Sequence, residues 1–227
     1  MRINHSRSYT AKFVASVING DLLPAPAWRA ADPLQVAEFR EEGSRSRPRV
    51  TGFLMYDDAA LYLKFAVEGE VVRCLGTAYQ DPVCRDSCVE FFVQPRDGAG
   101  YYNFEFNAIG TLLLSYIEDA ERLDGGFRKW KPVPAEDVTE MQVETTIDGV
   151  VDDPDSSPRS WALAARIPYS IFEPFLGAIA PKRGDEWRAN FYKCGDDTPC
   201  PHWASWAPIG EQLNFHVPEY FGTIVFG

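Results

Sequence analysis

The chain has 227 residues, of which 45% are hydrophobic and 14% aromatic, enough to build the core of one large domain. Its 33 acidic and 22 basic residues give a net charge of −11, and such a field repels polyphosphates and anionic lipid surfaces. This charge argues against nucleic acid as a partner, whereas a neutral ligand and bound calcium are both compatible with it.

Membrane insertion is not expected, because no apolar run reaches the roughly 20 residues that a spanning helix needs. Residues 1–7 also lack the apolar stretch of a secretory signal. If a signal was removed, the protein is secreted or displayed at the cell surface, and otherwise it is cytoplasmic. The sequence leaves the oligomeric state open.

Residues 1–48 contain four prolines and a charged run, and they predict an irregular N-terminal lead-in that packs on the domain. From residue 49 the pattern changes, and we assign residues 49–227 to a single domain. A hairpin is expected first, with strands at residues 53–56 and 61–67 joined by a polar turn.

Further short apolar or alternating runs predict strands, with short helical turns at residues 169–175 and a long surface excursion at residues 117–140. Many short strands separated by turn residues are typical of an all-β fold. We therefore predict an antiparallel β-sandwich, immunoglobulin-like or jelly-roll-like, with few short helical turns. The expected strands cover residues 86–93, 101–107, a run ending at 116, 141–147, 161–168, 186–194 and 223–226.

Three of these strands carry polar residues at alternate positions, which places the polar side chains on one face of the sheet. Glu90 lies on that face of the first strand, Asn103 and Glu105 on the second, and Asn190 and Tyr192 on the third. A solvated face of an antiparallel sheet would give the same pattern. The mixture of phenol, amide and carboxylate groups favours instead a surface that binds a polyhydroxylated ring.

Other residues are expected to support this surface. Two arginines project from the same face, and two loops supply further hydrogen-bonding or aromatic groups beside it. For two tryptophans among them, Trp203 and Trp206, packing over the end of the core is an equally valid interpretation. The additional candidate ligand-binding residues are Arg166, Arg188, Tyr79, Arg85, Trp203 and Trp206.

Glu90 and Glu105 also suggest an alternative, a small glycan hydrolase or lyase that uses the two carboxyl groups. Arg166 and Arg188, on the same expected face, would keep both carboxylates ionised, whereas hydrolysis needs one of them protonated. A charge network that orders the surface is therefore favoured over catalysis, and we name no catalytic residue.

The five cysteines leave at least one thiol free in a monomer. Cys84, Cys88, Cys194 and Cys200, with His202, offer zinc ligands, but their spacings differ from those of tight structural zinc motifs. A disulfide from Cys84 to Cys194 or Cys200 is the alternative in an exported protein, and buried small residues are the alternative in the cytoplasm. The metal content therefore remains unknown.

No cofactor is required by the pattern, and structural calcium is the one ion for which acidic turns provide oxygen ligands. Acidic turns are usually only solvated. The candidate turns contain Asp57 and Asp58, and Asp152, Asp153 and Asp155.

Several fragments, taken in order from about residue 50 to the end, resemble the family 9 carbohydrate-binding modules and their relatives with a DOMON-like sandwich. The resemblance implies a saccharide-binding β-sandwich, often appended to enzymes of plant-polysaccharide degradation and sometimes containing calcium. It assigns Glu90 to an acidic position that bonds sugar hydroxyls. Two aromatic clamp positions of the family correspond here to Cys84 and Phe215. The fragments are residues 86–92, 104–107, 161–168, 188–192, 205–206 and 215–224.

The sequence therefore predicts non-catalytic binding of an oligosaccharide or polysaccharide, or of its chain ends, on a polar and aromatic sheet face that includes Phe215. The enzyme with Glu90 and Glu105 is one alternative. A redox or haem-binding sandwich of the DOMON-like group is another, disfavoured because the chain has only three Met and three His residues. The identity of the saccharide stays open.

Overall fold

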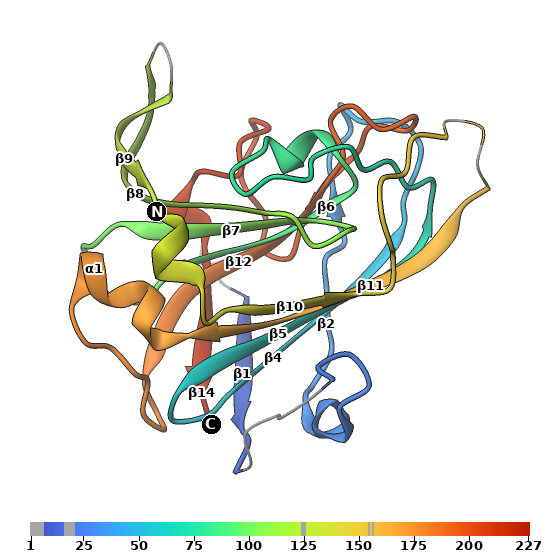
Figure 1. Ribbon diagram of the computed structural model, residues 1–227. Helices are drawn as coiled ribbons and strands as arrows, with labels where there is room; N and C mark the ends of the chain where they lie inside the picture. The colour runs from blue at the N-terminus through green and yellow to red at the C-terminus, as the bar shows by residue number, and fades with distance from the viewer. Residues whose placement is uncertain (1–6, 16–20, 124–125, 154, 156) are drawn as a thin grey trace.

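The computed structural model describes residues 7–15, 21–123, 126–153, 155 and 157–227. Figure 1 shows two layers of strands, which confirms the expected β-sandwich. In the first layer, which we call sheet A, the strands follow the order β14, β12, β6, β7, β8 and β9. Their bounds are Gly222–Phe226, Glu186–Cys194, Cys88–Gln94, Tyr101–Asn107, Leu112–Leu123 and Gly126–Pro132.

The second layer, sheet B, contains β10, β11, β5 and β4 in that order. Strand β1 (Ser8–Phe13) pairs in parallel with β14 through its first residues and with β4 through its last, so it joins the two sheets. The lead-in expected at residues 1–48 therefore contributes a strand between the two sheets. The bounds in sheet B are Gln142–Thr145, Arg159–Pro168, Ala60–Glu70 and Arg49–Tyr56.

Short elements complete the chain. Strand β2 (Leu34–Gln35) pairs with β4, and β3 (Glu38–Phe39) pairs with β13 (Trp203–Ser205), which in turn pairs with β12. Within the described ranges, the remaining elements are five 3-10 turns and one short helix: η1 Pro26–Ala30, η2 Val83–Arg85, η3 Ala135–Val138, η4 Tyr169–Phe172, η5 Pro218–Tyr220 and α1 Glu173–Leu176.

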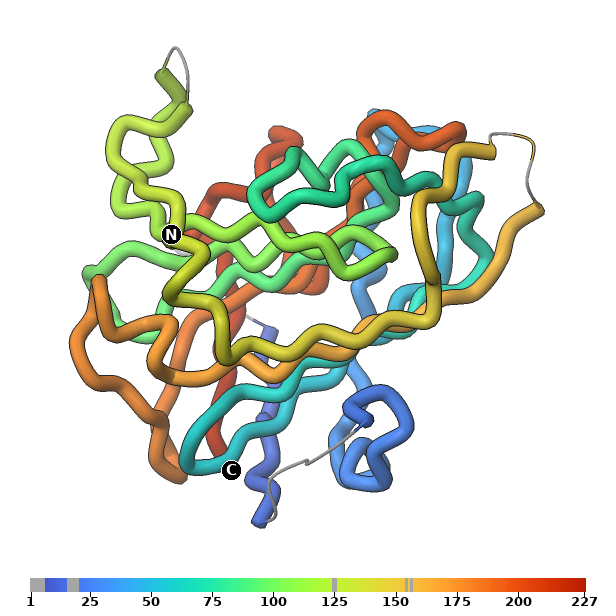
Figure 2. The backbone as a smooth tube through the Cα atoms, viewed as in Figure 1, coloured from blue at the N-terminus to red at the C-terminus, as the bar shows by residue number. Residues whose placement is uncertain are grey.

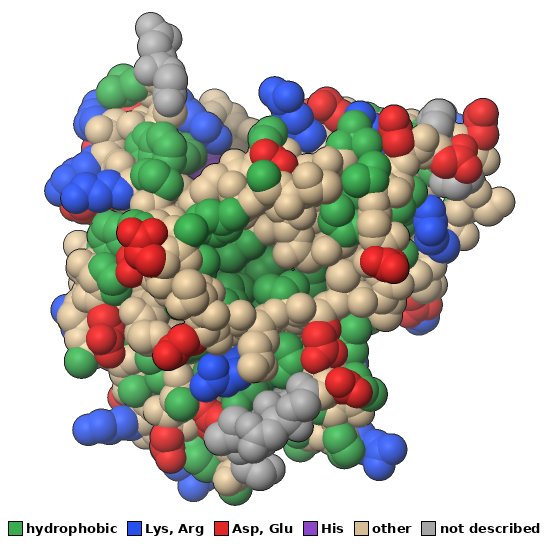
Figure 3. Space-filling model, in the orientation of Figure 1, with side chains coloured by type: hydrophobic (Ala, Val, Ile, Leu, Met, Phe, Trp, Pro, Cys, Tyr) green, Lys and Arg blue, Asp and Glu red, His purple; other side chains and the backbone are tan. Residues whose placement is uncertain are grey.

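The core lies between the sheets and follows the period-2 pattern of the strands. Phe91 of β6, Phe104 of β7 and Phe191 of β12 are fully buried there, and Phe65 of β5 approaches them from sheet B. Figure 3 shows hydrophobic side chains gathered in a hollow between the two layers, between β7 and β10. The opposite flanks of β6, β7 and β12 therefore face outward from sheet A.

In its first half, the surface excursion predicted at residues 117–140 is a largely exposed β-hairpin. Strand β8 continues to Leu123 and returns as β9, so that the two form a long hairpin that projects from the body of the sandwich (Figure 2). Among the residues that the structure describes, no helix is long and apolar enough to cross a bilayer.

Candidate functional site

Two carboxylates meet on the outer flank of sheet A. Glu90 of β6 and Glu105 of β7 are register partners on adjacent antiparallel strands, which places their side chains next to each other on one face. Only 3% of Glu90 and 5% of Glu105 is exposed. Asn103 is fixed beside them, because its Nδ2 donates to Glu105 Oε1 over 2.7 Å and its Oδ1 accepts from the Ser115 backbone N–H. The predicted grouping of these three residues is confirmed.

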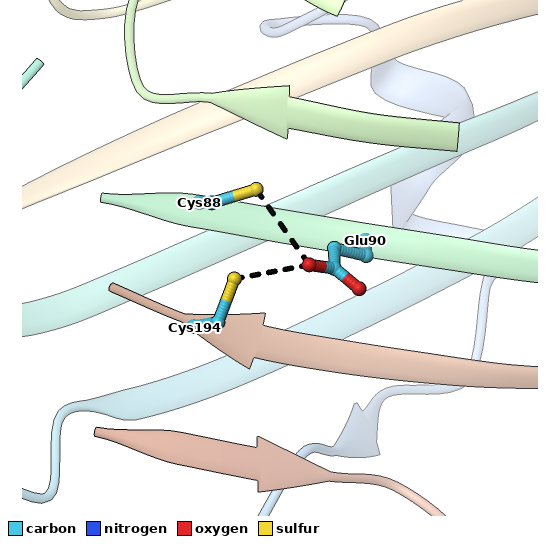
Figure 4. A group of neighbouring side chains, drawn as sticks. All are labelled: Cys88, Glu90 and Cys194. Carbon is cyan, nitrogen blue, oxygen red and sulfur yellow. Dashed lines mark hydrogen bonds between the residues drawn. The ribbon is translucent and has the colours of Figure 1, made fainter. Parts of the chain in front are cut away.

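Two thiols complete the cluster from the neighbouring strand pair. Cys88 of β6 and Cys194 of β12 are also register partners, and both point to the face that carries Glu90 (Figure 4). The Cys194 thiol donates to Glu90 Oε1 over 3.0 Å, and the Cys88 thiol lies 4.0 Å from the same oxygen. The sequence offered Cys88 and Cys194 as candidate zinc ligands but did not associate them with Glu90.

Burial dominates the electrostatics of this cluster. It raises the pKa of Glu90 well above the usual range, with the neighbouring Glu105 as the next cause, and it raises the pKa of Glu105 to about 7. Burial also raises the pKa of Cys88 to about 12 and that of Cys194 above its usual value. The expectation that arginines hold both carboxylates ionised is therefore wrong.

The open polar platform expected across β6, β7 and β12 is also wrong, because residues 207–221 cover the β12 part. Asn190 is fully buried and binds Ala207 through both backbone groups, at 3.0 and 2.9 Å. The Tyr192 hydroxyl donates to the Phe215 carbonyl oxygen, and Arg188 donates to carbonyl oxygens of Glu219 and Phe221. These three residues hold the covering segment in place.

What remains of the site is a small area rimmed by half-buried side chains. Cys84, Trp203 and Phe215 pack against the apolar cluster that contains Cys88 and Cys194. The Phe215 ring stacks on Tyr192, with centroids 4.2 Å apart, and the Trp203 indole N–H donates to Asp196 over 2.7 Å. The two positions that the resemblance matched to an aromatic clamp, Cys84 and Phe215, thus both pack against the cluster that contains Cys88 and Cys194.

Four further expected binding residues lie on the other sheet or contact other groups of the protein. They are Arg166, Trp206, Tyr79 and Arg85. Arg166 is on the outer face of sheet B, opposite Tyr62, because β11 belongs to that sheet. There it lines a pocket of about 440 Å³ with Asp58, Glu140 and Glu173 among others.

Trp206 is 3% exposed and packs edge-on against Phe191 in the core, so its predicted role in stacking on a ligand is wrong. Tyr79 packs against the core as well, and its hydroxyl donates to the Val133 carbonyl oxygen over 2.7 Å. Arg85 is exposed, and its nearest acidic partner is Asp197 at 3.9 Å.

A second pocket, of about 620 Å³, is lined by Phe39, Glu211 and residues 40–42, and its described lining does not include Glu90 or Glu105. Glu90 and Glu105 line neither of these two pockets, and their side chains are almost fully buried under the surface of sheet A.

The cysteines and acidic turns behave differently from the expected metal and disulfide patterns. All five cysteines lie in the described ranges, and all are free, so the expected disulfide from Cys84 is not formed. His202 approaches Glu70 on the core side, at 3.6 Å, and does not join the thiols.

Calcium at the two acidic turns stays a prediction, and one carboxylate of each turn contacts a protein group. The Asp57 carboxylate accepts hydrogen bonds from the N–H groups of Ala59 and Ala60 and from the Tyr62 hydroxyl. The two bonds to backbone N–H groups stabilise the turn between β4 and β5. Asp152 pairs with Arg73 at 3.3 Å. Within the described ranges, the one group of three ligand atoms lying within 4.8 Å of one another comes from Cys88, Glu90 and Cys194.

The sequence profile described as Carbohydrate-binding family 9 matches residues 29–226, nearly the whole chain. The chain belongs to this family. Solved structures agree with this assignment. A protein from Bacteroides uniformis ATCC 8492, described as a candidate carbohydrate-binding protein, superposes with a TM-score of 0.81 at 28% identity, over 98% of this chain and 100% of that chain.

Two further structures come from a carbohydrate-binding module of family 9 from Caldicellulosiruptor kristjanssonii, each at 14% identity, and they show the same fold. The complex with cellotriose has a TM-score of 0.64 over 97% of this chain and 93% of that chain. The complex with glucose has a TM-score of 0.65 over 97% and 96%. No curated protein matches the sequence significantly.

Proposed function

We propose that this family 9 chain binds a saccharide without cleaving it, at the outer flank of sheet A where Glu90, Asn103 and Glu105 meet the half-buried rings of Trp203 and Phe215. The observation that carries the proposal is the family match over residues 29–226. The glucose and cellotriose complexes of the Caldicellulosiruptor kristjanssonii module give the first ligands to test.

The chemistry of the flank suits such a ligand. Sugar hydroxyls both donate and accept, and they meet here two carboxyl groups, one amide and two aromatic rings. Glu90 Oε1 receives both thiol contacts, so Oε2 of the same carboxylate remains available to a hydroxyl group.

The alternative enzyme is disfavoured by geometry. A glycoside hydrolase places two carboxyl groups on either side of the scissile bond, with one ionised and the other protonated. Glu90 and Glu105 instead stand side by side on adjacent strands, and burial raises the pKa of both. Neither environment separates an acid from a nucleophile, so binding is the function that this pair supports.

The test is a calorimetric titration with glucose, cellotriose and a panel of xylo-, manno- and galacto-oligosaccharides, together with an assay for released reducing ends. We expect saturable binding of at least one saccharide without release of reducing ends. The variant Glu90→Gln should weaken binding by about 2- to 10-fold, the value of one hydrogen bond between neutral groups, because burial favours the neutral form of Glu90.

Arg166→Ala is the matched control, because Arg166 lies on the other sheet and should leave the affinity unchanged. Failure of every saccharide to bind would overturn the proposal. Release of reducing ends by the natural chain, lost in Glu90→Gln, would replace it with the enzyme. Loss of binding in Arg166→Ala alone would move the site to the pocket on sheet B.

A further inference from the structure

The cluster under the proposed saccharide site has a second property that sugar binding does not use. The sulfur atoms of Cys88 and Cys194 both point toward one carboxylate oxygen of Glu90, and these three donor atoms lie within 4.8 Å of one another. We infer that these three side chains form a binding site for one thiophilic divalent cation, with zinc as the expected ion. This inference goes beyond saccharide binding and does not depend on it.

The backbone holds the three donors in position before any ion arrives. Cys88 and Glu90 are two residues apart on β6 and therefore point the same way, and Cys194 is the register partner of Cys88 on β12. Ligand atoms of a tetrahedral zinc site lie about 3.3 to 3.8 Å apart. The thiol-to-carboxylate distances here are 3.0 and 4.0 Å, which bracket that spacing.

The carboxyl groups of the cluster have no basic partner among the described residues. Glu90 and Glu105 are both buried, and within the described part of the chain no Lys or Arg forms an ion pair with either. Lys193, the basic residue nearest in sequence to Cys194, points into the core and pairs with Glu70. The hydrogen bonds that Glu90 receives come from thiols, which are weak donors. A divalent ion would replace these contacts with direct bonds.

The donor set selects the kind of ion. Two sulfur atoms and one carboxylate oxygen suit zinc and its substitutes cobalt and cadmium, whereas calcium and magnesium require a shell of oxygens. Three protein ligands leave the fourth tetrahedral position open to water. The half-buried Cys84 packs against the same cluster.

The experiment is a titration of the reduced, metal-free natural chain with Co²⁺, without saccharide, followed by absorption spectroscopy. We expect one equivalent to bind, with a thiolate-to-cobalt charge-transfer band and the intense visible bands of tetrahedral cobalt, and Zn²⁺ should displace it. Native mass spectrometry of the natural chain with Zn²⁺ gives an independent count of one ion. Both measurements use the natural chain, so a misfolded variant cannot obscure them.

Variants then locate the ion. Cys88→Ser and Cys194→Ser should each lower the affinity by at least about 100-fold, since even the loss of a group that only supports a ligand costs 10- to 100-fold. Glu90→Gln should keep the charge-transfer band but weaken binding. Cys200→Ser is the matched control, because this half-buried cysteine lies outside the cluster, and it should bind normally.

Absence of Co²⁺ and Zn²⁺ binding to the reduced natural chain would overturn the inference. So would binding that survives Cys88→Ser and Cys194→Ser, or binding that is lost in Cys200→Ser. A Cys88 to Cys194 disulfide that persists in reductant would overturn it as well. None of these results bears on saccharide affinity, which is measured in a separate titration, so failure of one proposal is distinguishable from failure of the other.

Discussion

Lys193 of β12 and Glu70 at the end of β5 form an ion pair across the core, with Nζ 2.7 Å from Oε1 and both side chains fully buried. Glu70 Oε2 also accepts from the Trp161 indole N–H over 2.7 Å, and Lys193 donates to the Cys194 carbonyl oxygen. The pair therefore connects sheet A to sheet B at the level of the cysteine cluster. Its contribution to stability depends on both partners being present.

Lys193→Met should lower the free energy of unfolding by about 3 to 5 kcal/mol, because it leaves the Glu70 carboxylate buried without its cation. Urea denaturation measures this loss. Replacing both residues, Lys193→Met with Glu70→Leu, should recover part of it, since no buried charge then remains unpaired.

Arg49→Met provides the control for this prediction. Arg49 and Glu68 form an ion pair at the surface, where both side chains are exposed and water screens their attraction, so the pair contributes little to stability. If Lys193→Met cost no more than Arg49→Met, the connection between the sheets would have no special role in stability.

His202 makes the stability depend on pH. Burial lowers its pKa to about 4, and the positive charge of Lys193 contributes in the same direction. In the unfolded chain the imidazole takes up a proton below pH 6.5, whereas the folded chain keeps it neutral until about pH 4. The stability contributed by neutral His202 is therefore complete above pH 6.5 and is lost as the pH falls toward 4.

Across that window we expect His202 to account for a loss of about 3 kcal/mol, since each pKa unit corresponds to about 1.4 kcal/mol. His202→Gln has no proton to gain, so its free energy of unfolding should vary less between pH 7 and pH 4. Urea unfolding at several pH values, for both chains, measures the difference. Identical pH dependences would show that another group is responsible.

Alternation along the strands predicted the local part of the site correctly. Glu90 and Glu105 meet because β6 and β7 form a hairpin, in which neighbouring strands are also neighbours in sequence. The pairing of Cys88 with Cys194 joins strands about a hundred residues apart. Alternation along a strand predicts which of its side chains share a face of the sheet. It does not predict which distant strand pairs with that strand.

The same limit explains the placement of Arg166. Its position opposite the core-facing residues of β11 was predicted correctly, but both sheets have an outer face, and β11 belongs to sheet B. Asn190 shows a second limit, because a polar residue on an outward flank gives no signal that its amide is used to fix residues 207–221. The covering of β12 by residues 207–221 depends on tertiary packing, which strand alternation does not predict.

Trp203 and Trp206 were indistinguishable in the sequence, and the structure separates them. Trp206 is buried against Phe191, so Trp206→Ala should lower stability by about 3 to 5 kcal/mol. Trp203 is half-buried on the rim of the site, so Trp203→Ala should cost roughly half as much stability.

The same pair of variants tests the saccharide site. Trp203→Ala should lower saccharide affinity by about 2- to 10-fold, the value of one ring stacking on another. Trp206→Ala, measured at a temperature where it remains folded, should bind with unchanged affinity. An equal loss of affinity in the two variants would indicate that Trp203 supports the fold and does not contact the ligand.

Asn190 should control how firmly the covering segment is held. Its Oδ1 accepts from the N–H groups of Ala207 and Phe191, each at 2.9 Å, and its Nδ2 donates to the Ala207 carbonyl oxygen. Asn190→Ala leaves these buried groups without partners, so we expect a loss of about 2 to 4 kcal/mol. Hydrogen exchange should accelerate across residues 207–221, while the amides of β4 and β5 in sheet B keep their relative protection.

Asn190→Leu is the informative comparison, because it restores side-chain volume without restoring any of the three hydrogen bonds. If the amide holds the segment, exchange in residues 207–221 should be as fast in Asn190→Leu as in Asn190→Ala. If exchange instead returns to the natural rate, then filling the space under the segment is what holds it, and the hydrogen bonds to Ala207 are secondary.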